Sequence, residues 1–209
     1  CTTSDKDHAE NIVEFLNYPQ RIYPVGRLDK DSEGLLLMTN QGDIVNKILR
    51  GGNAHEKEYA VAVDHPVTEE FLKQMCEGVR IEDLDVTTKP CRAWKTGSHT
   101  FHIVLTQGLN RQIRRMCRAL DYHVMNLKRV RIMNIQLGTL KRGEYRELTE
   151  KELSDLMKLV EGSTNLPARE AAKIGKLVDP AKTVGKTARS GYQRKKNDRK
   201  PFVKNGERK

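Results

Sequence analysis

Patterns typical of membrane, secreted and zinc-binding proteins are absent from this sequence. Its four cysteines are widely scattered and never form a Cys-x-x-Cys pair, which argues against a zinc site. No run approaches the ~18 apolar residues of a membrane-spanning helix, and no secretory signal is visible. Aromatic residues amount to only 5% of the chain. A signal-free chain with scattered cysteines fits a reducing compartment, so we expect a cytoplasmic protein without a membrane partner.

Charge is abundant, but it is unevenly distributed. The net charge is +10, and residues 163–209 contain 14 Lys and Arg against 4 Asp and Glu, whereas the preceding residues hold 24 of each sign. The last 47 residues also lack hydrophobic periodicity. We therefore expect one domain over residues 1–162 and a basic, disordered tail over residues 163–209. Such a tail either adds salt-sensitive affinity for nucleic acid or serves solubility alone.

Hydrophobic periodicity predicts an α+β fold. Apolar spacing and capping residues indicate helices over residues 12–16, 44–49, 68–77 and 149–160. Alternating apolar residues indicate strands over residues 35–39, 59–63, 99–106, 122–137 and 145–148. Because consecutive strands lack regular helical crossovers, we expect a largely antiparallel sheet with flanking helices.

A charged loop between two glycines precedes the first buried strand. The loop is Gly26–Gly34, with the sequence GRLDKDSEG, and the apolar run 35–39 follows it. Glycine tolerates the backbone angles of a tight turn, so the loop can hold a carboxylate in a defined direction, as a nucleophile or a general base requires. In an extended segment Arg27 would lie on the same side as Asp29. A neighbouring cation keeps a carboxylate ionised.

Two other interpretations of this loop stay open. Asp29 or Asp31 can simply cap backbone N–H groups of a turn, which is a common role of loop aspartates. The spacing of Asp29, Asp31 and Glu33 before Gly34 also matches the start of an EF-hand calcium loop. That motif needs two flanking helices and a glutamate at its twelfth position, where this chain has Asn40.

A stripe of arginines marks the segment 107–120. At 100° per residue four arginines share about one third of a helix circumference, while Ile113 lies on the opposite, apolar side and Asn110 can cap the helix. The four are Arg111, Arg114, Arg115 and Arg118. Since like charges at this spacing repel, the stripe is either a solvated face or a phosphate-binding one, and arginine matches phosphate geometry. Lys128, Arg129 and Arg131 extend the basic patch, which suits a nucleic-acid backbone.

Three motifs together resemble those of the pseudouridine synthases of the RsuA type, which modify ribosomal RNA. The first is GRLDxxSEGLLL at residues 26–37, the second is Lys57-x-Tyr59, and the third is NRQIRR at residues 110–115. The resemblance implies that Asp29 is the catalytic residue and that Tyr59 lies against the target base. It further implies that Arg114 pairs with Asp29 and that Ile113 packs near Tyr59. On the pattern alone, Tyr59 could equally be a half-buried strand aromatic.

The resemblance also implies a fold and a reaction. The fold would be a mixed, mainly antiparallel sheet with a central cleft that holds the active aspartate. The reaction would move the glycosidic bond of a uridine from N1 to C5, without a metal or an organic cofactor. Arg27 would enter the RNA helix where the target base has flipped out. Whether Asp29 attacks the ribose C1′ as a nucleophile or acts through a glycal stays open.

The substrate implied is a structured stem-loop of ribosomal RNA. The runs HEKEY and RIMN most resemble the large-subunit synthases of the F type, so we expect 23S rRNA as the target and a monomeric enzyme. A Lys-Pro-x-Gly motif and a small RNA-binding domain that relatives carry upstream are not present, and the chain starts at Cys1 rather than Met. We therefore expect a catalytic-domain fragment. A catalytically silent RNA-binding or ribosome assembly module is the alternative.

Overall fold

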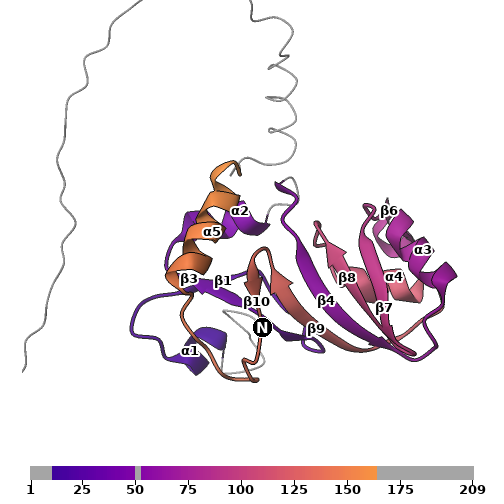
Figure 1. Cartoon of the computed structure of the whole chain (residues 1–209), viewed down its shortest axis with the longest axis horizontal. Helices are drawn as coiled ribbons and strands as arrows, with labels where there is room; N and C mark the ends of the chain where they lie inside the picture. Colours follow the sequence, from indigo (N-terminus) through magenta and orange to yellow (C-terminus); the bar gives the residue numbers. More distant parts are fainter. Residues whose placement is uncertain (1–10, 50–52, 164–209) are drawn as a thin grey trace, which may run out of the picture.

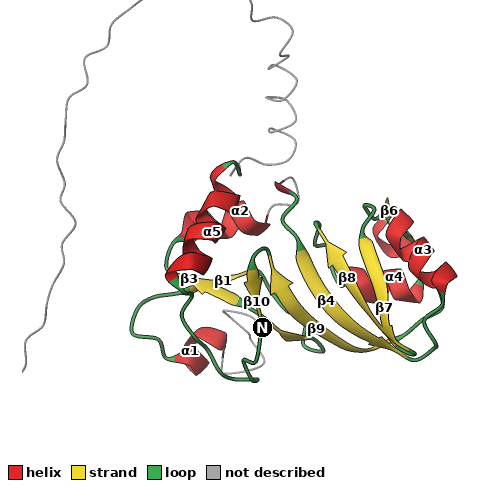
Figure 2. Cartoon of the chain, viewed as in Figure 1, coloured by secondary structure: helices red, strands yellow, loops and turns green. Residues whose placement is uncertain are grey.

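A computed structural model describes residues 11–49 and 53–163 of the chain. Its largest element is a six-stranded sheet in the order β10-β9-β4-β8-β7, with β2 beside β9 (Figures 1 and 2). The strands are β2 (Glu33–Gly34), β4 (Lys57–Val63), β7 (Arg92–Gly97), β8 (Thr100–Leu105), β9 (Val124–Ile132) and β10 (Ile135–Gln136). Every pairing is antiparallel except that of β2 with β9. The predicted α+β fold with a mixed, mainly antiparallel sheet is therefore confirmed.

One face of this sheet is covered by α3 (Glu69–Glu77) and α4 (Gln112–Arg118). Helix α3 begins where predicted because the Thr68 side chain accepts a hydrogen bond from the Phe71 amide. Its apolar side chains pack on the inward-facing residues of β4, β8 and β9. Two short strands, β5 (Arg80–Ile81) and β6 (Val86–Thr87), and a 3-10 turn (Glu82–Leu84) complete this half.

A second core lies at the other end of β9. There the two-stranded sheet of β1 (Tyr23–Val25) and β3 (Leu37–Thr39) packs with α2 (Gly42–Leu49) and α5 (Glu150–Glu161), which lie side by side in Figure 1. Helix α5 starts with the predicted capping box of Thr149 and Glu152. Helix α1 (Ile12–Leu16) lies at the start of the described chain. None of the described helices combines the length and the apolar character needed to span a bilayer.

Three predicted strands differ from the structure. Only the second part of the apolar run 35–39 is a strand, because the chain leaves β2 at Gly34 and enters β3, in another sheet, at Leu37. The segment 122–137 is broken by a turn at Met133, whose φ of 51° is incompatible with a strand. Residues 145–148 form a loop. The tail prediction for residues 163–209 falls, apart from Ser163, outside the described residues.

Candidate active site

Asp29 lies in the loop between β1 and β2, where the chain passes from the second core to the main sheet. Its main-chain carbonyl accepts a hydrogen bond from the Ser32 amide at 3.0 Å, which closes a turn. The residue is half-buried. Because strands rather than helices flank the loop, the EF-hand alternative does not fit. Residues 11–49 and 53–163 contain no cluster of His, Cys, Asp and Glu that could hold a metal ion.

Two guanidinium groups hold this loop on both sides of Asp29. Arg114 of α4 donates from Nη2 to the Asp31 carbonyl at 2.5 Å and from Nη1 to the Val124 carbonyl at 3.0 Å. Arg129 of β9 donates from Nε to the Leu35 carbonyl at 2.7 Å. It also donates from Nη1 to the carbonyl of Arg27 at 3.3 Å. The main chain before and after Asp29 is thus tied to two elements that are distant in sequence.

The predicted ion pair between Arg114 and Asp29 is not among the ion pairs of the described residues. Arg114 instead reaches the main chain two residues after Asp29. Arg114 is therefore brought to the loop that carries Asp29, but its contact there is with the carbonyl of Asp31. A pairing with the Asp29 carboxylate stays a prediction.

Tyr59 lies on β4, the strand whose first three residues are the Lys57-x-Tyr59 motif. On β4 it is paired with Ile103 of β8 and with Arg129 of β9. Arg129 is in turn paired with Gly34 at the end of the Asp29 loop, residues 26–34. Tyr59 packs against the core cluster that contains the buried Ile113 of α4, and a direct contact between these two residues stays a prediction. The elements that carry Asp29, Tyr59 and Arg114 therefore meet around β9.

The arginine stripe is divided among different partners. Arg111 has a left-handed backbone with φ of 49° and occupies the N-cap position without a capping side-chain bond, so the prediction that Asn110 caps the helix is wrong. Asn110 instead accepts hydrogen bonds from Arg115, which also forms an ion pair with Asp83 at 2.5 Å. Arg111 lies 3.4 Å from the carboxylate of Asp31. Arg118, at the end of α4, is exposed.

A β-bulge separates the three basic residues of β9. Glu58 is paired with Arg131 and the next residue of β4, Tyr59, is paired with Arg129, so β9 has one extra residue between them. The extra residue turns Arg129 and Arg131 to opposite faces of the sheet. Arg129 faces the core and is 4% exposed, whereas Lys128 shares the other face with its partner Ala60. The expected continuous basic patch is therefore corrected to two separate groups.

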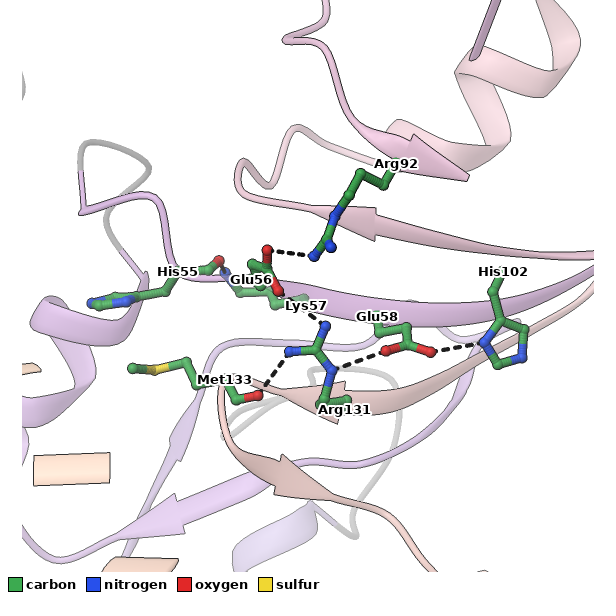
Figure 3. Close-up of polar contacts among 8 residues, drawn as sticks. All are labelled: His55, Glu56, Lys57, Glu58, Arg92, His102, Arg131 and Met133. Carbon is green, nitrogen blue, oxygen red and sulfur yellow. Dashed lines mark hydrogen bonds and ion pairs between the residues drawn. The ribbon is translucent and has the colours of Figure 1, made fainter. Parts of the chain in front are cut away.

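Arg131 is the centre of a polar network on the face opposite the helices (Figure 3). Its guanidinium donates to Glu58 at 2.9 Å, to Glu56 at 3.1 Å and to the Met133 carbonyl at 2.8 Å. His102 lies 2.8 Å from the other oxygen of Glu58. Burial alone would raise the pKa of Glu58, but hydrogen bonds from Arg131 and His102 lower it. Since its donors are occupied by protein groups, Arg131 is a poor candidate for the phosphate contact that its sequence suggested.

Lys57, the first residue of the Lys-x-Tyr motif, is a buried cation. It is 8% exposed and donates from Nζ to the His55 carbonyl at 3.2 Å. Burial, together with the positive charge of Arg129, lowers the pKa of Lys57 to about 8. Sequence reasoning missed this residue, although a lysine among the alternating apolar residues of β4 is itself a signal, because lysine is rarely buried.

We expect Lys57→Met to stabilise the fold at neutral pH. The pKa of Lys57 is about 8 in the folded protein, against 10.5 for an exposed lysine. Folding therefore disfavours the protonated form of this side chain. The protonated side chain therefore costs stability below pH 8, and this cost disappears as the pH rises towards 10.5. The pKa shift corresponds to a cost of about 3 kcal/mol, which the substitution removes. Loss of the hydrogen bond to the His55 carbonyl destabilises the variant by about 1 kcal/mol. The free energy of unfolding should therefore increase by about 2 kcal/mol.

Urea unfolding at pH 7 and at pH 10 measures this effect. The gain should be present at pH 7 and largely absent at pH 10. Lys73→Met, on the exposed side of α3, is the matched control and should change stability little at either pH. Equal destabilisation by Lys57→Met at both pH values would show that the ammonium group of Lys57 does not destabilise the folded state.

Comparison with known proteins agrees with this fold. The sequence profile of the family described as RNA pseudouridylate synthase matches residues 1–119. The chain belongs to this family of RNA-modifying isomerases. It is 46% identical to the dual-specificity RNA pseudouridine synthase RluF of Escherichia coli K12, over all of this chain and 72% of that protein. It is 36% identical to the ribosomal large subunit pseudouridine synthase B of Bacillus subtilis, over 78% of this chain and 70% of that protein.

A solved structure supports the fold. The crystal structure of a pseudouridylate synthase superimposes with a TM-score of 0.66 and 32% identity, covering 69% of this chain and 64% of that chain. The pseudouridine synthase fold is therefore confirmed, while a central cleft around Asp29 stays a prediction. The chain thus spans roughly two thirds to three quarters of these relatives.

Proposed function

We propose that the chain isomerises a specific uridine of ribosomal RNA to pseudouridine, with Asp29 as the nucleophile. The observation that carries this proposal is the loop around Asp29, whose two flanks are fixed by Arg114 and Arg129 next to the strand that bears Tyr59. A nucleophile must be held within a narrow geometry to attack. The names of the relatives, which are synthases acting on RNA and on the large ribosomal subunit, support 23S rRNA as the substrate.

The proposed reaction breaks one bond and forms one. The Asp29 carboxylate attacks C1′ of the ribose, and the bond from C1′ to N1 of uracil breaks with its electrons moving to the base. The base turns and C5 bonds to C1′ as the aspartate leaves. The proton on C5 is then removed and N1 is protonated, so the product is an isomer of the substrate. Tyr59 is the proposed acceptor of the C5 proton, because a phenol can both stack on a base and exchange a proton.

The target base must leave its stack before this chemistry, at a cost of a few kcal/mol. Arg27 is exposed beside Asp29 and is the proposed group that fills the gap in the RNA helix. Arg118 is exposed on the helix that also carries Arg114 and is proposed to contact the RNA backbone. The enzyme would act as a cytoplasmic monomer on a stem-loop.

Pseudouridine mapping tests this proposal. Unmodified 16S and 23S rRNA transcripts are incubated with the protein, and pseudouridines are located by chemical labelling and sequencing. We expect new pseudouridine at one or a few positions of 23S rRNA. If neither transcript gains pseudouridine, in the free form or in ribosomal particles, the catalytic proposal is wrong and the RNA-binding alternative stands.

The basic tail is proposed to strengthen RNA binding without being part of the folded domain. Residues 163–209 contain 14 Lys and Arg against 4 acidic residues, so neutralised phosphates would release counterions. Deleting residues 164–209 is expected to weaken RNA affinity at low salt and to reduce the slope of log affinity against log salt. The midpoint of thermal unfolding should not fall. An unchanged salt slope would assign the tail to solubility.

A further inference from the structure

Arg129 is a buried cation whose partners are all main-chain carbonyls. It is 4% exposed, and charged side chains are seldom buried unless a carboxylate pairs with them. Among the ion pairs of the described residues none includes Arg129, and its Nη2 group has no hydrogen-bond partner there. Lys57, a second buried cation, is close enough to repel it. A cation in this position opposes folding electrostatically, so its presence calls for a role.

The two carbonyls that Arg129 holds lie at the two ends of the catalytic loop. Nη1 binds the carbonyl of Arg27, two residues before Asp29, and Nε binds the carbonyl of Leu35, just after the loop. The main chain of Arg129 adds a third tie, because its carbonyl accepts from the Leu35 amide at 2.8 Å. A single residue of β9 therefore ties together the two ends of the segment that contains Asp29.

The β-bulge explains why Arg129 can do this. Without the extra residue between the pairs of Glu58 and Tyr59, the regular alternation of β9 would place Arg129 on the same face as Arg131. Bulges commonly redirect a side chain next to an active site. Here the bulge directs one arginine to the loop and leaves the other in the network of Figure 3.

We propose that Arg129 is a positioning residue, which fixes the Asp29 carboxylate at the angle and distance needed to attack the ribose. This role rests on the proposed function and replaces the phosphate contact that the sequence suggested. Arg129 would not touch the RNA. It acts through the main chain of the loop, so its loss should slow the chemical step and leave RNA affinity unchanged.

Single-turnover kinetics on the 23S transcript test the proposal with Arg129→Met and Arg129→Lys. At saturating enzyme Arg129→Met should be about 100-fold slower than the unchanged protein, the loss expected for a displacement of about 1 Å in a reacting group. Its Kd for the RNA should stay within about twofold. Arg129→Lys, which can reach only one of the two carbonyls, should lie between them. Arg146→Met removes a guanidinium that binds Glu152 far along the chain and should keep the full rate.

Each other outcome decides against the role. A folded Arg129→Met with the full rate, or with weaker RNA binding and an unchanged saturating rate, would overturn it. Should Arg129→Met fail to fold, Arg129→Lys at the full rate would do the same. Amide hydrogen exchange separates this inference from the proposed function. Even if the protein makes no pseudouridine, faster exchange at the Ser32 and Leu35 amides in Arg129→Lys supports the proposal that Arg129 holds the loop in place. Unchanged exchange refutes it.

Discussion

Asp29→Asn is expected to abolish pseudouridine formation while leaving the fold and the affinity for RNA intact. The amide has the shape of the carboxylate but cannot act as the nucleophile, so the rate should fall by at least about 10⁴-fold, as it does when a nucleophile is removed from other enzymes. Stability should change by less than about 1 kcal/mol, because the turn at Asp29 uses its main-chain carbonyl. Single-turnover kinetics and pseudouridine mapping measure the loss, and thermal unfolding checks the fold.

Asp31→Asn is the matched comparison within the same loop. The carboxylate of Asp31 is 60% exposed, and among the described residues its one ion pair is the long one to Arg111. Arg114 binds the main-chain carbonyl of Asp31, which the substitution keeps. We expect a loss of no more than about tenfold. A loop in which both variants were fully active would have no catalytic aspartate, whereas equal inactivity of both would point to loss of loop structure.

Local signals in the sequence predicted much of the fold. Thr68 and Thr149 are capping residues whose effect depends on the next three residues only, so α3 and α5 could be located closely. The alternation along 59–63 likewise identified β4. The proposed role of the Asp29 loop, and its nearness to the other two motifs, came from the resemblance to a family, since no local rule connects residues so far apart in sequence.

The features that were missed depend on pairing between strands. In the sequence, Arg129 and Arg131 are two residues apart and should share a face, but the bulge opposite Glu58 and Tyr59 reverses one of them. A one-residue shift exchanges the faces of a strand, and nothing local marks where it occurs. The left-handed backbone of Arg111 was also missed, because the sequence before α4 favoured Asn110 as the capping residue.

Gly34→Ala is expected to destabilise the fold strongly although it adds only one methyl group. Gly34 has φ of +106°, and an added Cβ would lie 2.6 Å from the amide nitrogen of Arg129 and closer still to its carbonyl oxygen. These are main-chain atoms of a central strand, so they cannot move aside as a side-chain tip can. Backbone strain and overpacking each cost about 1–3 kcal/mol, and we expect a loss of about 4 kcal/mol in the free energy of unfolding.

Gly138→Ala separates the two causes. Gly138 also has a positive φ, of 57°, but no neighbouring atom in the described part of the chain lies within 4 Å of an added Cβ, so this variant should lose only about 1 kcal/mol. Urea unfolding of both variants measures the difference. A similar small loss for both would mean that β2 can move away from β9. That result would also argue against the positioning role of Arg129. The close approach of Gly34 to β9 is what places the Leu35 carbonyl within hydrogen-bond distance of the Arg129 guanidinium. A large loss at Gly34 alone would show instead that the loop carrying Asp29 is held to the sheet by a main-chain contact that only glycine permits.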